Sequence, residues 1–421
     1  MRAMKDGGVE WIGEIPEVWG IAYLFQFVQQ VKNKNLDLSE KNLLSLSYGK
    51  IKRKDINTSE GLLPASFENY NVIEKNDIVL RLTDLQNDHN SLRVGLATER
   101  GIITSAYITL RPNVAIESGY LYYSLHTFDI VKGFYGMGAG VRQGLNYDEV
   151  KAIKIPLPPI AEQNAIAAYL DDKCDKIDSI ITANERIIAK LKEYKVSLIT
   201  ETVTKGLNPD AEMKDSDVEW IGEIPEAWGV VCLKYAGHFE NGLTYSPNDI
   251  TDGRGILVLR SSNIQSGQLN FADCVYVSKV PEALMVKNND IIICSRNGSA
   301  DLVGKCAYVD KDIVATFGAF MMRYRATIFN RFAFHVLQAA ISYYKSLFTT
   351  STINQLTIKT IRQMKIPLPP LAEQNQIAAY LDDKCAKIDN NIRLREALIA
   401  KLLDYKKSLI YETVTGKKEI V

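Results

Sequence analysis

An internal repeat constrains the fold of this chain more than any other feature of its sequence. Val9 to Gly20 reads VEWIGEIPEVWG and returns at Val218 to Gly229 as VEWIGEIPEAWG. Ile155 to Asp178 returns at Ile366 to Asp389 with three changes in twenty-four positions. The offsets of 209 and 211 residues divide the chain into two halves. Because the segments between these blocks are much less alike, we expect one scaffold that carries two different binding domains for a target of two parts.

Length and composition indicate a folded protein of two domains. A chain of 421 residues is too long for one ordinary core. It is 46% hydrophobic and 24% charged, and no run approaches the roughly 18 apolar residues that cross a bilayer. The N-terminal residues lack the pattern of an export signal. We therefore expect a cytoplasmic protein with no membrane partner.

Charge is unevenly distributed, although the whole chain has a formal charge of zero. Residues 230–365 hold fifteen Lys or Arg against nine Asp or Glu, whereas residues 206–229 hold one Lys against seven acids. Residues 21–154 are nearly balanced, with sixteen basic and fourteen acidic side chains. The second domain could therefore attract a polyanion broadly, and the first only through a local patch.

A long helix is predicted at the end of each half. The IPLPP segments at 155–159 and 366–370 force extended backbone, and helical periodicity follows for about 40 residues until Gly206 and Gly416. Each helix would be about 60 Å long. Its single apolar stripe requires a partner, and the simplest partner is the other copy, paired antiparallel about a pseudo-twofold axis. The seam residues are Ile166, Leu170, Ile177, Ile181, Ile188, Leu191, Leu198, Ile377, Leu381, Ile388, Ile392, Ile399, Leu402 and Leu409.

Other side chains on these helices repeat as well. Cys174 and Cys385 lie on apolar faces and are interpreted as buried packing thiols, since the chain has no CxxC pair that would suggest zinc. Four tyrosines also recur, and they could be either additional core or a docking surface for partner helices: Tyr169, Tyr194, Tyr380 and Tyr405.

The regions between the repeated blocks read as diverged α+β domains. Lys75 to Leu80 matches Asn288 to Ile293, and Val94-Gly95 matches Val303-Gly304. Short β-rich runs with Gly and Asn turns precede a Tyr- and Phe-rich helix in each. We expect a first domain at 1–154 with its Trp box, a helical region at 155–206, an acidic connector, second Trp box and second domain at 207–365, and a second helical region at 366–421.

Within the shared frame, a few polar segments differ between the halves and are the candidate DNA contacts. Arg can grip guanine with two hydrogen bonds, and Asn or Gln can do the same for adenine, so this composition suits base readout. Small hydroxyls near a helix start suit phosphate. In the first half the candidates are Thr83, Asp84, Gln86, Asn87, Ser91, Arg93, Arg142 and Gln143. In the second they are Arg260, Ser262, Asn263, Gln265, Arg296, Asn297, Ser299, Lys305, Asn354 and Gln355.

The alternative interpretation of every such segment is an ordinary polar turn or helix cap. No P-loop, GxSxG, HExxH, Asn-Pro-Pro-Tyr or acid-rich metal cluster occurs in the sequence. The paired acids at 171–172 and 382–383 point to different helix faces and favour a solvated surface. Neither a catalytic residue nor a metal ligand is therefore assigned.

These features together resemble the specificity subunit of a type I restriction-modification system. The resemblance covers essentially the whole chain and is carried by the PLPPxAEQ-type segments at 156–163 and 367–374, the WIGEIPExWG boxes and the ETVT helix ends at 201–204 and 412–415. It implies two α+β target-recognition domains and two long antiparallel helices in a coiled coil with pseudo-twofold symmetry. It also implies readout of a bipartite asymmetric DNA sequence, one half-site per domain, with the helix pair setting the gap.

The resemblance further implies partners and cofactors. Two adenine methyltransferase subunits would dock on the helical regions, and two restriction subunits can join them. This chain would bind no cofactor, since S-adenosylmethionine, ATP and Mg would belong to the partner subunits. The competing interpretation is an orphan or regulatory DNA-binding scaffold without active restriction partners, and a third is an enzyme with an unrecognised site.

Overall fold

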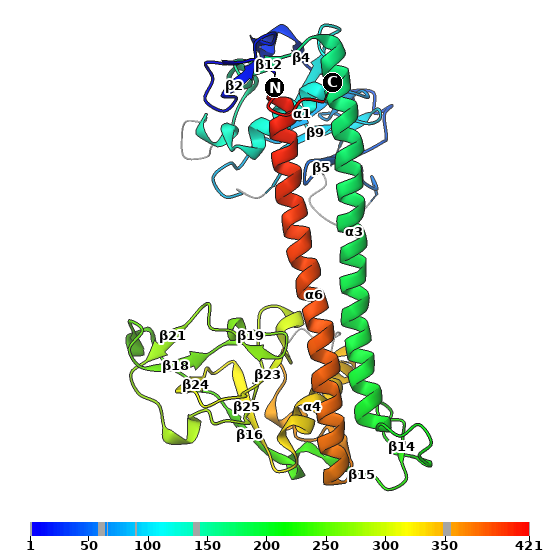
Figure 1. Ribbon diagram of the computed structural model, residues 1–421, viewed down its shortest axis with the longest axis vertical. Coiled ribbons are helices and arrows are strands. Elements are labelled where there is room, and N and C mark those ends of the chain that lie inside the picture. The colour runs from blue at the N-terminus through cyan, green and yellow to red at the C-terminus, as the bar shows by residue number, and fades with distance from the viewer. Residues whose placement is uncertain are drawn as a thin grey trace. The chain divides into compact units, whose positions relative to one another are not determined.

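The computed structural model describes residues 2–57, 64, 66–88, 91–137, 144–347 and 355–420. The chain divides into two compact units, one formed by residues 1–184 and 397–421 and the other by residues 185–396 (Figure 1). Each unit contains one α+β domain and parts of both long helices. In the described part of the chain, no helix is both long and apolar enough to span a membrane.

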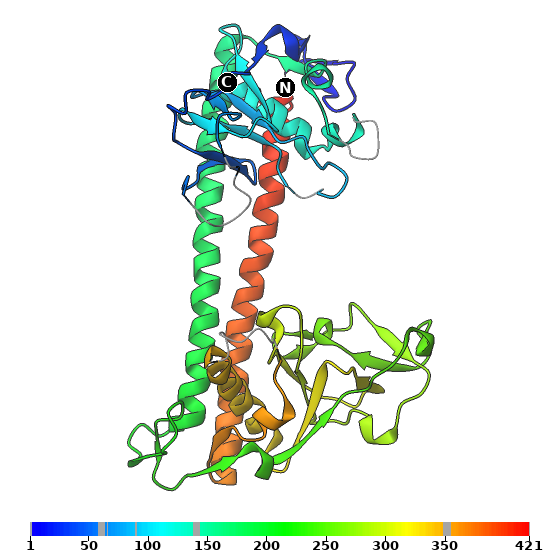
Figure 2. The same cartoon turned by 180° about the vertical axis from the view of Figure 1, so that it is seen from behind.

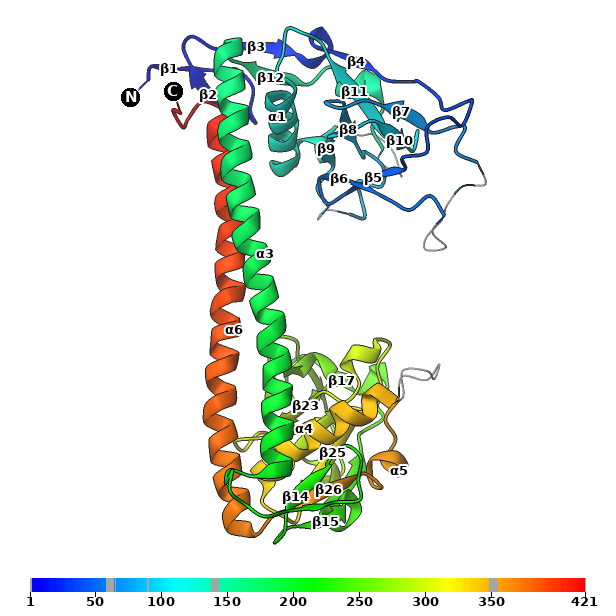
Figure 3. The same ribbon diagram turned by 90° about the vertical axis from the view of Figure 1, so that its right-hand side faces the viewer.

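The domain of the first unit is built around a four-stranded antiparallel sheet in the order β4-β11-β8-β9 (Figure 3). Helix α1 packs on this sheet. The other strands of the domain pair in four two-stranded ladders. The elements are β1 (Met4–Asp6), β2 (Glu14–Pro16), β3 (Gly20–Tyr23), β4 (Val28–Gln30), β5 (Leu44–Ser47), β6 (Lys50–Arg53), β7 (Asn71–Ile73), β8 (Ile78–Leu80), β9 (Val94–Leu96), β10 (Gly101–Ile103), β11 (Ile108–Pro112), α1 (Ser118–Ile130), α2 (Tyr147–Val150) and β12 (Lys154–Leu157).

The domain of the second unit repeats this sheet in the order β16-β25-β22-β23 and adds a second four-stranded sheet, β17-β21-β18-β24. The elements are β13 (Met213–Asp215), β14 (Glu223–Pro225), β15 (Gly229–Cys232), β16 (Gly237–Asn241), β17 (Ile250–Thr251), β18 (Ile256–Leu259), β19 (Ile264–Gln265), β20 (Gln268–Leu269), β21 (Val275–Val277), β22 (Ile291–Cys294), β23 (Cys306–Tyr308), β24 (Ala315–Phe317), β25 (Met321–Ala326), α4 (Asn330–Leu347), α5 (Ile358–Ile361) and β26 (Lys365–Leu368).

Strand pairing confirms one predicted match and corrects another. Ile78 pairs with Leu96 in β9, and the matching Ile291 pairs with Tyr308 in β23. Val94-Gly95 is therefore equivalent to Cys306-Ala307, not to Val303-Gly304. The loop between the paired strands is one residue shorter in the second domain, at 294–305 against 81–93, and a Val-Gly pair is too short to fix the register.

A buried aspartate stabilises the same turn in both domains. Asp77 is 1% exposed; it accepts hydrogen bonds from the backbone N–H of Glu74 at 2.8 Å and from Nε and one terminal nitrogen of the Arg111 guanidinium at 2.8 and 2.7 Å. Asp290 is bound in the same way by the backbone of Lys287 and the side chain of Arg325. A buried carboxylate needs such pairing to offset its desolvation.

The long helices are α3 (Ile160–Lys205) and α6 (Leu371–Val414). The proline segments before them are extended, as predicted, and form strands β12 and β26, which pair with β3 and β15. Each helix ends at a glycine in the left-handed region, Gly206 with φ 75° and Gly416 with φ 72°. The helices are slightly shorter than the predicted helical regions, 155–206 and 366–421, because those regions include the extended proline segments.

Both units pair a segment of α3 with an antiparallel segment of α6. In the first unit Lys406 binds Asp178 at 2.6 Å, and in the second unit the repeat-related Lys195 binds Asp389 at 2.6 Å. Ten of the fourteen predicted seam residues are buried, and the other four are half-buried: Leu191, Leu198, Ile399 and Leu402. Cys174 and Cys385 are buried, as predicted, and burial raises the pKa of Cys385 to about 11.

The Trp box joins the start of one long helix to the end of the other. Trp19 donates its indole N–H to Glu162 at the start of α3, and its ring lies against Gly416 beyond the end of α6. Figures 1 and 2 accordingly show both chain termini in the first unit. Trp228 makes the equivalent contacts with Glu373 and Gly206 in the second unit.

The glutamine of each PLPPxAEQ segment connects the helix to the adjacent domain. Gln163 donates to the carbonyl of Pro158 and accepts from the backbone N–H of Glu117, which caps α1. Gln374 repeats both bonds, to Pro369 and Phe329. The near-identity of these segments thus reflects a structural joint.

Candidate nucleic-acid interface

In the second unit, three of the predicted segments come together. The loop after β22 lies beside the 260–263 turn, because the Asn297 side-chain amide donates to the Ser261 hydroxyl at 3.0 Å. Residues 355–356 join the same loop through a β-bridge between Arg296 and Gln355 and a bond from Leu356 N–H to the Ser295 carbonyl at 2.8 Å. Polar side chains that are far apart in the sequence therefore share one surface.

Arg296 and Phe320 are both exposed on this surface. The Arg296 guanidinium lies 5.5 Å from the centre of the Phe320 ring, and the ring is 60% exposed. An exposed arginine held over an aromatic face keeps its donors available, and such a ring can stack on a base. Sequence reasoning missed Phe320, since nothing in a Gly-Ala-Phe turn indicates that its ring faces solvent.

The 260–273 turn is held together by two of the predicted residues. Asn263 is 0% exposed; its side chain accepts from the backbone N–H of Arg260 and donates to the carbonyls of Asn270 and Asp273. The prediction of a DNA contact from Asn263 is therefore corrected, because its amide is used within the turn. Arg260 is ion-paired with Asp273 at 2.7 Å, and Ser262 is exposed.

A groove of about 1130 Å³ runs beside this surface within the second unit. Gln265 and Lys305, two predicted contacts, line it together with residues of both long helices. Its lining includes five basic side chains, Lys192, Lys195, Lys305, Lys345 and Arg393, against three acidic ones, Asp301, Asp389 and Glu396. The resulting positive balance favours a polyanion. The helix residues were missed because they lie on segments that were interpreted as seam and scaffold.

In the first unit, the loop after β8 likewise meets the segment that precedes α2. The backbone N–H of Leu145 bonds to the carbonyl of Leu82 at 3.0 Å, so the segment before α2 lies beside the loop after β8. Thr83, Gln86 and Asn87 are exposed there, and Asn87 donates to Asp84 at 2.7 Å. Ser91 is half-buried, with its backbone N–H bonded to Asp88. Three predicted contacts, Arg142, Gln143 and Asn354, lie outside the described residues.

Arg93 has a different role from the predicted one. Its side chain is wholly buried, and its guanidinium donates to the carbonyls of Arg81, Thr83 and Asp88 and, through Nε, to the Tyr135 hydroxyl. Those bonds hold the loop in its curved path. Arg93 therefore positions the exposed amides and does not itself present donors to a base in this conformation.

One thiol and three carboxylates line the basic groove of the second unit. Cys306 lines the basic groove, but burial raises its pKa to about 12 and keeps the thiol neutral. Among the described residues, no group of three His, Cys, Asp or Glu side chains is placed to share a metal ion. The chemistry that these surfaces offer is hydrogen bonding, stacking and positive charge.

Comparison with known proteins agrees with this geometry. The family model of the type I restriction modification DNA specificity domain matches residues 26–193 and 225–403. The MjaVIII specificity subunit of a type I restriction enzyme from Methanocaldococcus jannaschii is 26% identical and is covered over 93% of its length by 96% of this chain. The EcoKI specificity subunit from Escherichia coli K12 is 30% identical over 206 residues, which span 47% of this chain and 44% of that protein.

A solved structure supports the fold. A chain from a study of complex assembly and conformational transition of the type I R-M system superimposes with a TM-score of 0.68 at 16% identity, over 96% of this chain and 99% of that one. The fold is thus shared at low sequence identity. With two family-model matches that together span most of its length, the chain belongs to the family of type I restriction modification DNA specificity domains.

Proposed function

We propose that this chain is the non-catalytic specificity subunit of a type I restriction-modification complex and reads a bipartite, asymmetric DNA target. Each α+β domain would read one half-site, and the helix pair would set the gap between them. The observation that carries the proposal is the loop after β8 and its equivalent after β22, which differ in composition within an otherwise repeated sheet. A repeated frame with different polar loops is what two half-sites of different sequence require.

The proposed partners follow from the exposed side chains of the long helices. Tyr194, Leu398 and Tyr405 are each more than 40% exposed, so the helices retain apolar surface after they pair. Adenine methyltransferase subunits, one for each half, would cover such surface, and restriction subunits would join them. S-adenosylmethionine, ATP and Mg would be held by those partners, and the complex would act on DNA in the cytoplasm.

The test is to co-express the chain with its methyltransferase in a host that lacks adenine methylation and to map methylated adenines across the genome. We expect a gapped motif of two parts. Replacing both Arg296→Ala and Asn297→Ala should abolish methylation at the wild-type motif or relax one half of it, leaving the other half unchanged. Lys214→Ala, which removes an exposed positive charge from strand β13, is the matched control and should leave the motif intact.

The outcomes separate the proposal from its alternative. A wild-type complex that copurifies but methylates nothing would favour an orphan or regulatory DNA-binding scaffold. A motif that is unchanged by the Arg296 and Asn297 substitutions would remove that loop from the recognition surface.

A further inference from the structure

The first unit contains an arginine side chain inserted between the Trp box and the start of α3. The Arg2 guanidinium binds both carboxylate oxygens of Glu162, with one N–O distance of 2.9 Å, and lies 5.5 Å from the centre of the Trp19 ring. Glu162 also accepts the Trp19 indole N–H at 2.8 Å. This bidentate contact lowers the pKa of the Glu162 carboxyl. Glu162 and Trp19 thus form an arginine site that the chain fills by itself.

The second unit has the same site without the arginine. Trp228 donates its indole N–H to Glu373 at 2.9 Å, as Trp19 does to Glu162. The register is fixed by a repeated backbone bond, Glu17 N–H to the Ala3 carbonyl in the first unit and Glu226 N–H to the Glu212 carbonyl in the second. The residue before Ala3 is Arg2, and the residue before Glu212 is Ala211. Alanine therefore stands where the repeat places arginine.

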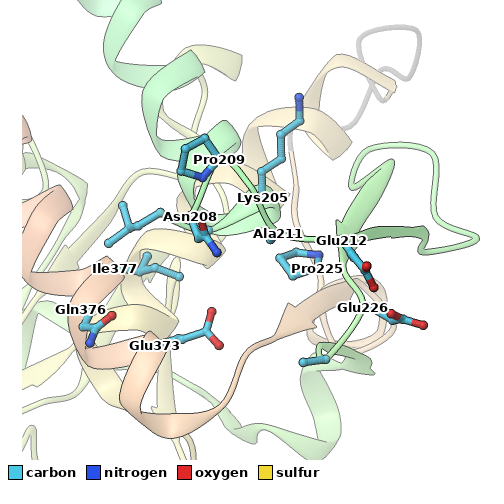
Figure 4. A pocket seen from close by; sticks show the side chains of 13 residues that line it. Lys205, Asn208, Pro209, Ala211, Glu212, Pro225, Glu226, Glu373, Gln376 and Ile377 are labelled. Carbon is cyan, nitrogen blue, oxygen red and sulfur yellow. The ribbon is translucent and has the colours of Figure 1, made fainter.

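A pocket of about 900 Å³ occupies this place in the second unit. It is lined by Ala211, Glu373 and the connector, and Glu212 and Glu226 add two further carboxylates (Figure 4). Lys205 also lines it, but Figure 4 shows its amino group directed away from Glu373. In the described part of the chain, no ion pair to Glu373 is recorded. The carboxylate that binds a guanidinium in one unit therefore faces an open, acidic pocket in the other.

We propose that this pocket is an arginine socket, which binds the guanidinium of an arginine side chain from a partner protein. A planar guanidinium matches a carboxylate with two parallel hydrogen bonds, and an ammonium does not. The volume admits the side chain together with neighbouring residues of a peptide segment. The choice of a protein partner rests on the proposed function, whereas the preference for a guanidinium rests on the repeated site alone.

The socket makes the two halves of the scaffold unequal. In the first unit Arg2 closes the site, so only the second unit can accept an arginine from outside. Two copies of one partner bound to the two halves would therefore make different contacts at this position.

The test uses fluorine NMR on the full chain labelled with 5-fluorotryptophan. The chain has four tryptophans, so four fluorine signals are expected. The probe is the peptide acetyl-Arg-Ala-Met-amide, and the control peptide carries citrulline, which has the shape of arginine without its charge. We expect the Trp228 signal to shift with the arginine peptide and the Trp19 signal to stay. Glu373→Gln should weaken the binding about tenfold or more, since a charge-assisted contact is lost. Ala211→Arg should abolish it by filling the socket.

Arg2→Ala is the matched variant in the first unit and should make the Trp19 signal respond as well. Equal shifts with the citrulline peptide, or no Trp228 shift in the wild-type chain, would overturn the proposal, whichever way Arg2→Ala behaves. Ala211→Arg should also reduce copurification of the methyltransferase while DNA binding by the chain is unchanged. A wild-type chain that recognises no specific DNA sequence would instead contradict the proposed function. The result with the arginine peptide would still stand.

Discussion

Asp129, at the end of α1, shows how a single residue can couple stability to pH. It is 1% exposed, and its carboxylate accepts the backbone N–H of Arg93 at 2.7 Å. Burial raises the pKa of Asp129 to about 6 from an ordinary value of 3.8. The folded state therefore holds this proton more tightly than the unfolded chain does, and the stabilisation that results is lost as the pH rises from about 4 through 6.

Asp129→Asn keeps an acceptor for Arg93 and removes the ionisation. At pH 7 the variant should have a higher unfolding free energy than the wild-type protein, by up to about 3 kcal/mol for a shift of two pKa units. The two proteins should converge near pH 4. Urea unfolding between pH 4 and 8 measures the difference. Burial lowers the pKa of His126 to about 4. His126 is present in both proteins, so its effect cancels in the difference between their unfolding free energies. A difference that does not vary with pH would contradict the assignment.

Two arginines in equivalent loops show what sequence could and could not predict at this scale. Arg93 and Arg296 were both predicted to contact DNA, yet Arg93 is buried and Arg296 is exposed. Composition places an arginine in a loop, but its direction depends on which backbone carbonyls the folded loop leaves unpaired. In the first domain Arg93 satisfies four of them. Only the folded loop distinguishes a positioning residue from a contact.

At the scale of elements, the helices and their junctions were predictable because their signals are local and repeated. Proline segments, heptad periodicity and terminal glycines located α3 and α6 closely. The sheets were less predictable, since their strands are two to six residues long and their order depends on distant pairing. The roles of Trp19 and Glu162 could not be predicted, because 143 residues separate them.

The glycines that end the long helices provide a graded test of these junctions. Gly416→Ala should destabilise the protein more than Gly206→Ala. A Cβ at 416 would overlap the Pro16 ring, whereas one at 206 would lie 3.0 Å from the Trp228 ring. Each change also costs about 1 kcal/mol because both residues have positive φ. Overlap at 416 should add about 1–3 kcal/mol. Urea unfolding curves measure both effects.

Gly222→Ala is the control for the backbone cost alone. Gly222 has φ 64°, and nothing lies within 4 Å of the added Cβ. The unfolding free energy of the Gly222→Ala variant should fall only by the cost of placing alanine at a positive φ, which all three variants share. Equal losses in all three variants would show that the added methyl groups at 206 and 416 fit beside the Trp228 and Pro16 rings without further cost.

At the scale of the whole molecule, the repeat places the N-terminal and C-terminal segments of the chain in the same unit. In the second unit α3 leads into strand β13 through the connector 207–212, which has six residues. In the first unit the end of α6 and strand β1 belong to the same joint but are not covalently linked. Lys417 donates to the carbonyl of Ile12 at 2.7 Å, and Gly416 lies against Trp19. Linking residue 421 to residue 1 would place eight residues between Gly416 and Met4.

A circular permutant that begins at Pro209, ends at Asn208 and carries this linkage should therefore keep both joints. Trp19 keeps Glu162 and Gly416, Trp228 keeps Glu373 and Gly206, and the chain is opened within the exposed connector. We expect the same methylated motif and the same gap as for the wild-type chain when the permutant is co-expressed with the methyltransferase. A second permutant opened at Asn184, within α3, is the control and should fail, since it breaks the helix that runs through both units. A failing connector-opened permutant would show that specificity depends on chain order and not on the repeated joints. A working helix-opened permutant would show that an unbroken α3 is not required.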